Sequence, residues 1–450
     1  NISFNNTITG DTTLTVNTAG TTLFDKAVSI GQLTTDLAGF VQINAPTIAT
    51  TGTQTYNDAM TLLSNTVLSS TGAAAAGNIT FNSTVDGAKT LTVNTAGNTT
   101  FNGRVGNTTA LMSLTTDAAG TTNVNGLSVK TIAAQTYNDD VVVGAHAVFS
   151  SVGDAVAVPA VAAGDIAFKK TLTGAFNVDV NTAGNTLFND TVNIAQLTTD
   201  AAGTVQINAA TVTTSGTQTY NDTLTLLNNT TLSSTGAGNI TFNKTIDGAK
   251  TLAINTAGTI VFNDQVGSVT PLTSISTGAQ GSILFQGAVG AAPIHVRTVT
   301  GQTYNNPIVM GVDVFFESLG QVLPVAVAQG DITFNGAING GFNLIVNTTG
   351  VTNFNGPLGA VTTLASVTTD AGGSVQFGGT GTVTTLSGSN FTGTYVRTTG
   401  AQTYNDTVTL VANTMLESSN AGNLTFGSTV DGGFDLKLNT AGVTAFNAPV

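Results

Sequence analysis

The sequence predicts an all-β protein that winds into a parallel β-helix, also called a β-solenoid. Three observations lead to this prediction. A cassette of fixed internal spacing occurs six times, a bulky apolar residue followed in most cases by Asn recurs about every 21 residues, and the segments between turns alternate apolar and small polar residues. A step of this length holds two or three short strands, which is the size of one solenoid coil.

The cassette is typified by FNSTVDGAKTLTVNTAGNTTF at residues 81–101. Every copy has a Phe, an Asn 13 residues later and a second Phe 7 residues after that Asn. Its strand-like pieces are rich in Val, Ile, Thr and Phe, and turns with Gly or Asn bound them. The six copies are Phe4/Asn17/Phe24, Phe81/Asn94/Phe101, Phe168/Asn181/Phe188, Phe242/Asn255/Phe262, Phe334/Asn347/Phe354 and Phe426/Asn439/Phe446.

Two further units lie between the cassettes. A unit similar to Leu-Thr-Thr-Asp-Ala-Ala-Gly occurs at residues 33–39, 114–120 and 197–203, and more loosely at 367–373. A Gln-Thr-Tyr-Asn unit carries five of the six Tyr, and an apolar residue follows each of them after 12 residues. These pairs are Tyr56/Leu68, Tyr137/Phe149, Tyr220/Leu232, Tyr304/Phe316 and Tyr404/Leu416.

We expect residues 1–450 to form one continuous solenoid of about 21–22 coils of roughly 21 residues, grouped in four-coil super-repeats that start near residues 1, 78, 165, 239, 331 and 423, the last one partial. One coil cannot bury its apolar face alone, so coils stack and their bulky residues form an interior column. Each buried side chain contributes roughly 1.5 to 3 kcal/mol. The aromatic members expected in this column are Phe4, Phe24, Phe81, Phe101, Phe168, Phe188, Phe242, Phe262, Phe334, Phe354, Phe426, Phe446, Tyr56, Tyr137, Tyr220, Tyr304 and Tyr404.

Asn follows most of these bulky residues, which predicts an amide ladder at a turn. Stacked Asn side chains can hydrogen-bond along the column, and Asn tolerates left-handed backbone geometry. The residues expected in this ladder are Asn5, Asn57, Asn82, Asn102, Asn138, Asn189, Asn221, Asn243, Asn263, Asn305, Asn355 and Asn405.

The composition excludes several classes of protein. Charged residues make up 8% of the chain, and the net charge is −13 with only 11 Lys and Arg, so a nucleic-acid role is not expected. The chain has no Cys, which excludes disulfides and thiolate metal sites. We expect no transmembrane segment, because no apolar run reaches the 18 residues that a membrane helix needs.

The cassettes, together with the TTDAAG and QTYND segments, resemble the repeat regions of filamentous-haemagglutinin-like adhesins and of other giant bacterial surface proteins built from β-strand repeats. The resemblance covers essentially the whole chain, and its motifs are compositional. It implies a right-handed parallel β-helix that is exported to the cell surface. Within residues 1–450 we identify no segment that resembles the amino-terminal secretion segment of that family.

Two insertions interrupt the repeat at the same phase. SSVGDAVAVPAVAAGD follows Phe149, and ESLGQVLPVAVAQGD follows Phe316. Each is either an excursion folded back on the flank of the solenoid or an apolar patch for lateral association with another copy. The residues of the candidate lateral contact are Val156, Val158, Pro159, Val161, Val322, Leu323, Pro324 and Val325. The segment 378–402 is also enlarged, and it carries Phe391, Tyr395 and Arg397.

Candidates for chemistry are few, and we expect no catalytic, cofactor or metal residues. His146 and His295 lie far apart, and each is expected at the surface. Lys130, Arg297 and Arg397 stand seven residues before a Tyr, either as solvated turn charges or as ligands of an anionic glycan. Calcium binding is an alternative, but the sequence lacks the glycine-rich nonapeptide pattern of calcium-binding β-rolls. The recurring carboxylates are best interpreted as turn formers: Asp36, Asp117, Asp200, Asp370, Asp58, Asp139, Asp222 and Asp406.

Three functions are compatible with these observations. The first is a structural, non-catalytic extracellular rod, a segment of a longer surface filament, sheath or giant surface protein that self-associates end to end or laterally. The second is an adhesin shaft that binds glycan or a host surface. The third is a carbohydrate-active β-helix enzyme, which needs clustered Asp with Lys or Arg on one face. The chain opens and closes inside the same cassette, so we expect the solenoid either to continue in the same polypeptide or to dock on another copy there.

Overall fold

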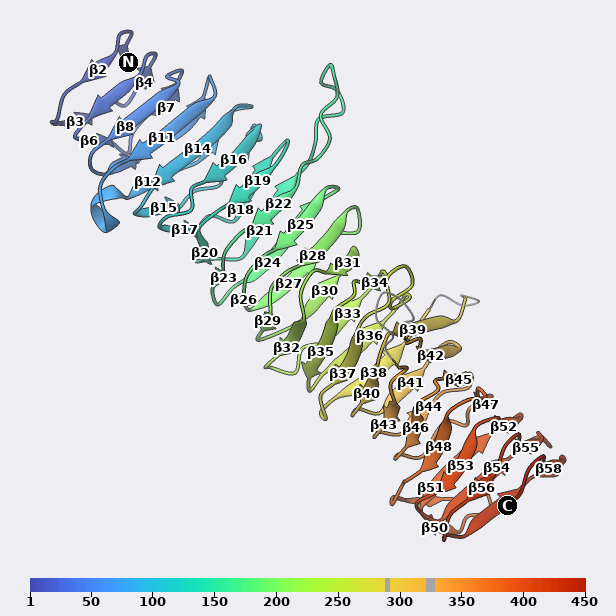
Figure 1. Ribbon diagram of the computed structural model, residues 1–450. Helices are drawn as coiled ribbons and strands as arrows, with labels where there is room; N and C mark the ends of the chain where they lie inside the picture. Colours follow the sequence, from blue (N-terminus) through green and yellow to red (C-terminus); the bar gives the residue numbers. More distant parts are fainter. Residues whose placement is uncertain (288–291, 321–327) are drawn as a thin grey trace. The chain divides into compact units, whose positions relative to one another are not determined.

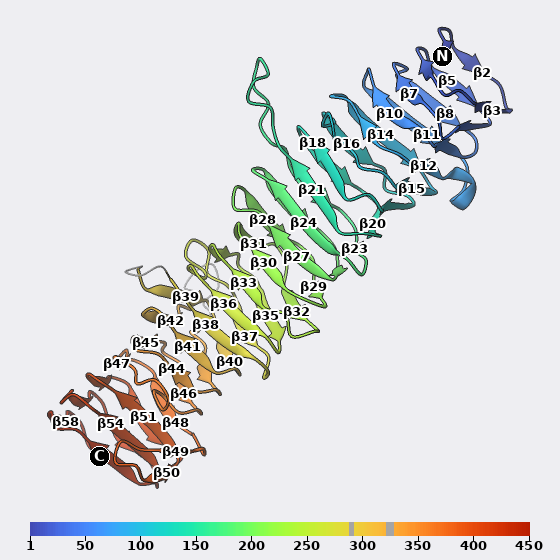
Figure 2. The ribbon, with the colours of Figure 1, turned by 180° about the vertical axis from the view of Figure 1, so that it is seen from behind.

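The computed structural model describes residues 1–287, 292–320 and 328–450, and it confirms the predicted all-β parallel β-solenoid (Figure 1). The solenoid has about 20 turns of about 22 residues each. The chain divides into two compact units. Unit 1 comprises residues 1–215 and 220–222, and unit 2 comprises residues 216–219 and 223–450. Figure 2 shows the stacked coils of each unit from behind.

Unit 1 has three parallel sheets, and each coil contributes one strand to each sheet, except that the coil of Val105 contributes only a single bridge to sheet 1. Sheet 1 continues from β13 to β18 through single bridges at Val105. Sheet 1 contains β1 (Ile2–Phe4), β4 (Thr21–Phe24), β7 (Phe40–Ile43), β10 (Ala59–Leu62), β13 (Val85–Asp86), β18 (Ser128–Thr131), β21 (Ala147–Ser151), β24 (Asn177–Thr182) and β27 (Gln196–Thr199). Sheet 2 contains β2 (Ile8–Thr9), β5 (Val28–Ile30), β8 (Thr47–Thr50), β11 (Thr66–Ser70), β14 (Thr90–Thr95), β16 (Ser113–Thr116), β19 (Gln135–Tyr137), β22 (Ile166–Phe168), β25 (Asn185–Phe188) and β28 (Thr204–Ile207). Sheet 3 contains β3 (Thr13–Val16), β6 (Gln32–Thr35), β9 (Gln54–Tyr56), β12 (Ile79–Phe81), β15 (Asn98–Phe101), β17 (Thr121–Val124), β20 (Asp140–Val143), β23 (Leu172–Thr173), β26 (Val192–Ile194) and β29 (Thr211–Thr214). A short 3-10 helix, η1 (Ala74–Gly77), precedes β12.

Unit 2 repeats this plan, and β30 (Gln218–Tyr220) contributes residues to both units. Single bridges at Val266 and Leu358 continue two of its sheets. Sheet 4 contains β31 (Thr223–Leu226), β34 (Ile246–Asp247), β39 (Ile294–Thr298), β42 (Val314–Ser318), β45 (Asn343–Asn347), β47 (Ser366–Thr369), β52 (Gln402–Tyr404), β55 (Leu424–Phe426) and β58 (Thr444–Phe446). Sheet 5 contains β32 (Thr230–Ser234), β35 (Thr251–Thr256), β37 (Ser274–Thr277), β40 (Gln302–Tyr304), β43 (Ile332–Phe334), β46 (Val351–Phe354), β48 (Ser374–Phe377), β53 (Thr407–Leu410) and β56 (Val430–Asp431). Sheet 6 contains β33 (Ile240–Phe242), β36 (Thr259–Phe262), β38 (Ser282–Phe285), β41 (Ile308–Met310), β44 (Ile338–Asn339), β51 (Thr394–Thr398), β54 (Thr414–Ser418) and β57 (Leu436–Asn439). An antiparallel hairpin, β49 (Thr382–Thr384) and β50 (Asn390–Thr392), extends from one coil.

Period-two alternation places the apolar residues inside each coil. In β14, Leu91 and Val93 are fully buried, whereas Thr90 and Thr92 point outward. β-Branched residues suit this pleated surface, half of which is buried. At the corners the backbones of successive coils approach closely. Gly120 has φ +82°, and a Cβ there would lie 1.9 Å from the carbonyl oxygen of Gly97 in the coil below, so only Gly fits.

Aromatic side chains stack between coils in register. Phe81 aligns with Tyr56 on one side and with Phe101 on the other, and the ring centroids are 5.5 and 4.9 Å apart. The aromatic residue that follows a Tyr after 12 residues packs edge-on against the stack: Phe149 lies 5.5 Å from Tyr137 with an interplanar angle of 82°. Such pairs add roughly 0.5 to 1.5 kcal/mol beyond their burial.

The registers do not form the single column that the sequence suggested. In unit 1, Phe4, Phe24, Ile43 and Leu62 align in sheet 1, and the next series, which begins at Tyr56, lies in sheet 3. The series that begins at Tyr137 lies in sheet 2. The expected column was wrong at these points because the 13 residues from Ile43 to Tyr56 are fewer than one coil. The same short steps explain why the solenoid has about 20 turns rather than 21–22.

In unit 2 the series are likewise divided among the sheets. Phe242, Phe262, Phe285 and Met310 align in sheet 6. Tyr304, Phe334, Phe354, Phe377 and Leu410 align in sheet 5. Tyr404, Phe426 and Phe446 align in sheet 4.

We predict that Phe81→Ala lowers the free energy of unfolding by about 3 to 5 kcal/mol, because it removes a buried ring and leaves a cavity between two others. Phe40→Ala is the matched control, since the Phe40 side chain is 60% exposed. Urea denaturation followed by circular dichroism measures both. Equal losses for the two variants would contradict the placement of Phe81 in the core.

Candidate functional site

The Asn residues that follow the stacked rings form short ladders on the outside of the corners. Asn82 Nδ2 donates to Asn57 Oδ1 at 2.6 Å, Asn102 Nδ2 to Asn82 Oδ1 at 2.7 Å, and Asn125 Nδ2 to Asn102 Oδ1 at 2.8 Å. The first amide, Asn57 Nδ2, donates to the carbonyl oxygen of Thr35 at 2.5 Å. The ladder therefore begins at the residue after each Tyr.

Other members of the predicted Asn ladder occupy equivalent places. Asn138, Asn221, Asn305 and Asn405 start a ladder by donating to a Thr carbonyl oxygen of a lower coil. Asn263 donates to Asn243, and Asn355 donates through Asn335 to Asn305. Where Lys169 replaces Asn, Asn189 Nδ2 donates to the Lys169 carbonyl oxygen instead. Asn5 follows Phe4 in the first coil.

A buried Gln–Tyr pair lies at each of the five Gln-Thr-Tyr-Asn units, and sequence reasoning missed the role of its Gln. Gln302 is fully buried; its Nε2 donates to Val296 O, Thr298 Oγ1 and Glu317 O, and its Oε1 accepts from Tyr304 Oη at 2.7 Å. Because Gln and Tyr are two residues apart on a strand, their side chains lie on the same face. Burial raises the pKa of Tyr304 well above its ordinary value.

The two series of predicted turn aspartates meet in pairs at the corners. Asp200 Oδ1 accepts from the backbone N–H of Thr182 in the coil below at 3.0 Å. Asp222, one coil above, accepts from the backbone N–H of Gly203, in the turn that begins at Asp200, at 2.8 Å. The separation of 22 residues, one coil, is the sequence signal that could have identified this pairing. The four pairs are Asp36/Asp58, Asp117/Asp139, Asp200/Asp222 and Asp370/Asp406.

The upper carboxyl group of each pair is buried. Asp58, Asp139, Asp222 and Asp406 are each 2% exposed. Burial is the largest cause that raises the pKa of all four, and the charge of the lower Asp adds to it. The pKa of Asp139 rises to about 6 even though Thr116 and Thr122 donate hydroxyl hydrogen bonds to it at 2.6 and 2.8 Å.

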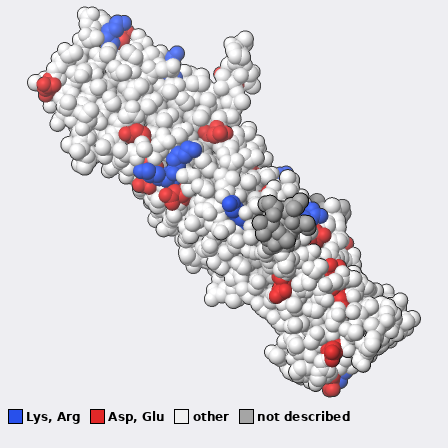
Figure 3. Space-filling model, viewed as in Figure 1, with Lys and Arg blue, Asp and Glu red and all other residues white. Residues whose placement is uncertain are grey.

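Charged side chains are sparse on the face that Figure 3 shows. The three basic residues singled out in the sequence lie on strands rather than at turns. Lys130, Arg297 and Arg397 belong to β18, β39 and β51, so their interpretation as turn charges was wrong. Arg297 Nε donates to Glu317 Oε2 at 2.8 Å, and His295 Nδ1 lies 2.8 Å from the same oxygen.

The two histidines differ in exposure. The His295 side chain lies on the outer side of β39, is 25% exposed and stacks on Phe315, with ring centroids 4.5 Å apart. The side chain of His146 is 51% exposed and pairs with Asp179.

The enlarged segment 378–402 contains the β49–β50 hairpin and then strand β51 of sheet 6. Phe391 and Tyr395 are both buried, and the Tyr395 hydroxyl donates to Glu417 Oε2. Tyr395 and Arg397 align with Met415 and Glu417 in the neighbouring strand. These side chains therefore pack within the unit, and Lys437 lies 5.7 Å from the Phe391 ring.

The first apolar insertion projects as a hairpin from unit 1 (Figure 1). Asp154 and Val161 exchange backbone hydrogen bonds, and Asp154 Oδ1 accepts from the backbone N–H groups of Val156 and Ala157. Val156 is 89% exposed and Val158 is 99% exposed. The alternative in which this excursion folds back on the flank was wrong, because these side chains touch almost nothing. The second predicted patch, residues 322–325, lies outside the described residues.

A shallow groove of about 570 Å³ lies at one corner of unit 2. Uncharged polar and small side chains line it, among them Ser233, Asn255, Thr256 and Gln280. Within the described residues there is no group of three or more His, Cys, Asp or Glu that could hold a metal ion. The described part of the chain also contains no helix long and apolar enough to span a membrane.

We predict that Gln302→Leu destabilises the protein by about 2 to 4 kcal/mol, since it leaves the Tyr304 hydroxyl and three acceptors without their partner. Tyr304→Phe should cost less, because only the Gln302 Oε1 loses a hydrogen bond. Urea unfolding of both variants tests the network, and a larger loss for Tyr304→Phe would refute this ranking.

The raised pKa of Asp139 predicts how the stability of the fold depends on pH. The pKa of this carboxyl group is raised from an ordinary 3.8 to about 6, so its neutral form is favoured in the folded state. The resulting stability is present below pH 4 and is lost as the pH rises through 6. Relative to wild type, Asp139→Asn should therefore gain roughly 2 to 3 kcal/mol between pH 4 and pH 7 in buffer with a chelator. Asp190→Asn, at an exposed Asp, is the control. If the Asp139→Asn variant instead became less stable relative to wild type as the pH rises, a raised pKa of Asp139 would be excluded.

No family model, curated protein or solved structure matches the chain.

Proposed function

We propose that the chain is a structural, non-catalytic segment of an extracellular filament, sheath or giant surface protein, and that it associates laterally with further copies. The projecting hairpin carries this proposal. Two of the most exposed apolar side chains of the described residues, Val156 and Val158, stand together on it. Exposed apolar groups of this kind usually mark an interface.

The use of the polar side chains supports a structural role. Asn, Gln and Asp side chains that could serve in chemistry hydrogen-bond instead to other strands of the solenoid, as Asn82 does to Asn57 and Gln135 does to the carbonyl oxygen of Ser150. Such bonds stabilise coil stacking and leave few reactive groups free. The resemblance of the cassettes to bacterial filamentous-haemagglutinin-like repeats supports a right-handed solenoid at the cell surface.

Glycan binding, as in the shaft of an adhesin, is a second candidate function. The groove in unit 2 favours it, because amide and hydroxyl groups of Asn255, Thr256 and Gln280 line an open surface. These groups can donate to and accept from sugar hydroxyls. Saturable glycan binding that Gln280→Ala abolishes, without loss of fold, would support this candidate over the first.

The lateral contact is tested by deleting residues 154–163 and by a Val156→Asp/Val158→Asp variant. Wild type should form side-by-side bundles that electron microscopy and sedimentation detect, and both changes should abolish them, because they remove or charge the apolar contact. Leu37→Asp is the matched control, since Leu37 is 81% exposed but lies at a turn in another coil. Unchanged bundling in the two hairpin variants would refute the proposed contact.

A further inference from the structure

We propose that three of the corner aspartate pairs bind a hard divalent cation of the Ca²⁺ class. The three pairs are Asp36/Asp58, Asp200/Asp222 and Asp370/Asp406. The fourth pair, Asp117/Asp139, is excluded by its own hydrogen bonds. The site is separate from the hairpin, so it does not depend on the proposed lateral association.

The first argument is a set of buried carboxylate oxygens that have no hydrogen-bond partner. Both oxygens of Asp58, Oδ2 of Asp222 and Oδ2 of Asp406 are buried and have no hydrogen-bond partner of normal geometry. The hydroxyl groups of Thr35, Thr199 and Thr369 lie near enough to lower the pKa of these carboxyl groups, but burial outweighs that effect. Each of these three residues is 2% exposed. An uncompensated buried charge costs several kcal/mol, so a partner is expected in the functional protein.

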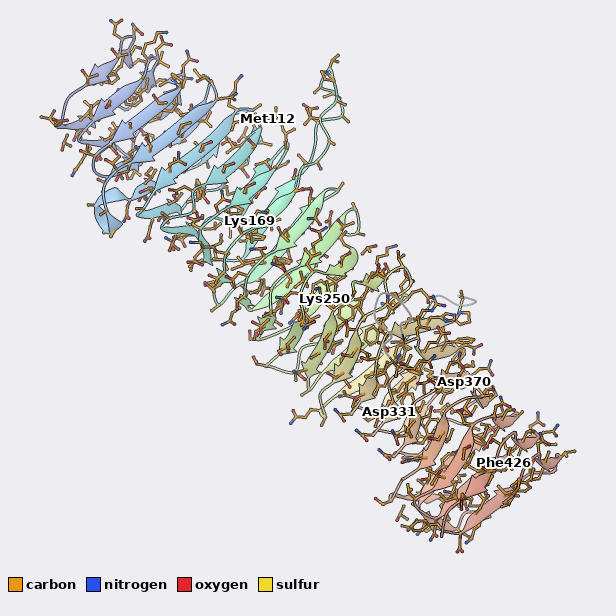
Figure 4. The ribbon with its side chains drawn as sticks, viewed as in Figure 1. Met112, Lys169, Lys250, Asp331, Asp370 and Phe426 are labelled. Carbon is orange, nitrogen blue, oxygen red and sulfur yellow. The ribbon has the colours of Figure 1, made fainter. Side chains whose placement is uncertain are left out.

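The second argument is the direction of these carboxylates. Asp222 Oδ1 accepts from Gly203 N–H, and Asp406 Oδ1 accepts from Gly373 N–H at 2.9 Å. These glycines end the turns that begin at Asp200 and Asp370. Asp370, labelled in Figure 4, follows β47 directly. The upper carboxylates Asp222 and Asp406 are therefore aimed into the turns that hold Asp200 and Asp370.

At the Asp36/Asp58 pair the two turns are joined by the residues before the carboxylates, and neither Asp58 oxygen has a hydrogen-bond partner. Asn57 donates through its backbone N–H to Thr35 Oγ1 at 3.1 Å and through Nδ2 to Thr35 O at 2.5 Å. The residue before Asp58 is thus fixed to the residue before Asp36. Asp36 Oδ1 is also buried and unpartnered, which gives this corner three free carboxylate oxygens.

Protonation does not satisfy these oxygens. A protonated carboxyl oxygen becomes a donor and needs an acceptor of its own. A hard cation satisfies the charge and the free lone pairs together, and two carboxylates match a divalent charge. Turn carbonyl oxygens, Thr hydroxyl groups and water would complete the oxygen ligands that such a cation needs.

The chain contains two natural comparisons. In the fourth repeat Gly278 and Asn306 stand where the other repeats have the two Asp, so both carboxylates are absent together. Asn306 Nδ2 donates to Gln280 O in the turn below, whereas its Oδ1 is buried without a hydrogen-bond partner and carries no charge. At the Asp117/Asp139 pair, residue 122 is Thr, whereas the equivalent residues at the other three pairs are Val41, Val205 and Val375. The Thr122 hydroxyl group donates to Asp139. The corner of the fourth repeat therefore has no carboxylate, and the Asp117/Asp139 corner has an additional hydroxyl donor from Thr122. The other three corners keep carboxylate oxygens without a hydrogen-bond partner.

The experiment uses Tb³⁺ as a probe with the full chain after chelator treatment. The chain has no Trp, and Tyr56, Tyr220 and Tyr404 each precede a proposed ligand by two residues. Tyrosine excitation should therefore give saturable Tb³⁺ emission at about three ions per chain, and Ca²⁺ should displace it. Ca²⁺ alone should raise the thermal unfolding midpoint.

The Asp58→Asn/Asp222→Asn/Asp406→Asn variant should lose both the emission and the Ca²⁺-dependent shift. Asn306 shows that the corner accepts Asn, and circular dichroism checks the fold of the variant. Asp11→Asn/Asp190→Asn/Asp435→Asn changes the charge equally at exposed positions and should keep both signals. Absence of saturable emission in wild type, or emission that survives in the corner variant, would overturn the proposal.

Discussion

Stacking of like residues, one coil above the next, is the constraint on which the structure depends. A parallel pairing fixes which residue lies over which, and a coil of about 22 residues brings Phe81 over Tyr56 and under Phe101. A flat ring loses little rotamer freedom in such a stack and buries its faces against its neighbours. The core is thus built from repeated local contacts, as in other quasi-one-dimensional proteins.

The same constraint governs the polar residues. Polar groups find their partners in the adjacent coil, as the exposed Asn102 does in Asn82 and the half-buried Asp200 does in the Thr182 N–H group. The rule is incomplete at several buried atoms, among them strand hydroxyl groups such as Thr99 Oγ1 and the corner carboxylates. Asp58 is buried with both oxygens unpartnered, and because a buried carboxylate is costlier to leave unpaired than a hydroxyl group, this corner motivates the proposed cation site.

The sequence was sufficient to predict the solenoid, because the spacing from Phe81 to Phe101 is close to one coil and repeats without change. It was insufficient for the register, because the step from Ile43 to Tyr56 shows the same apolar-Asn pattern although it covers only part of a coil. The Asp pairs could have been predicted from their separation of 22 residues in three of the four cases. The projection of the hairpin at Val158 could not, since apolar composition alone favours neither exposure nor burial.

Cross-linking of paired Cys substitutions tests the stacking register most directly, because the natural chain has no Cys. Asn82→Cys/Asn102→Cys places two thiols at neighbouring ladder positions, and Asn44→Cys/Asn57→Cys places two at corners that follow strands of different sheets. With a short bifunctional thiol reagent, the first pair should link rapidly within one chain and the second should not. Efficient linking of the second pair, or none of the first, would contradict the register on which the account rests.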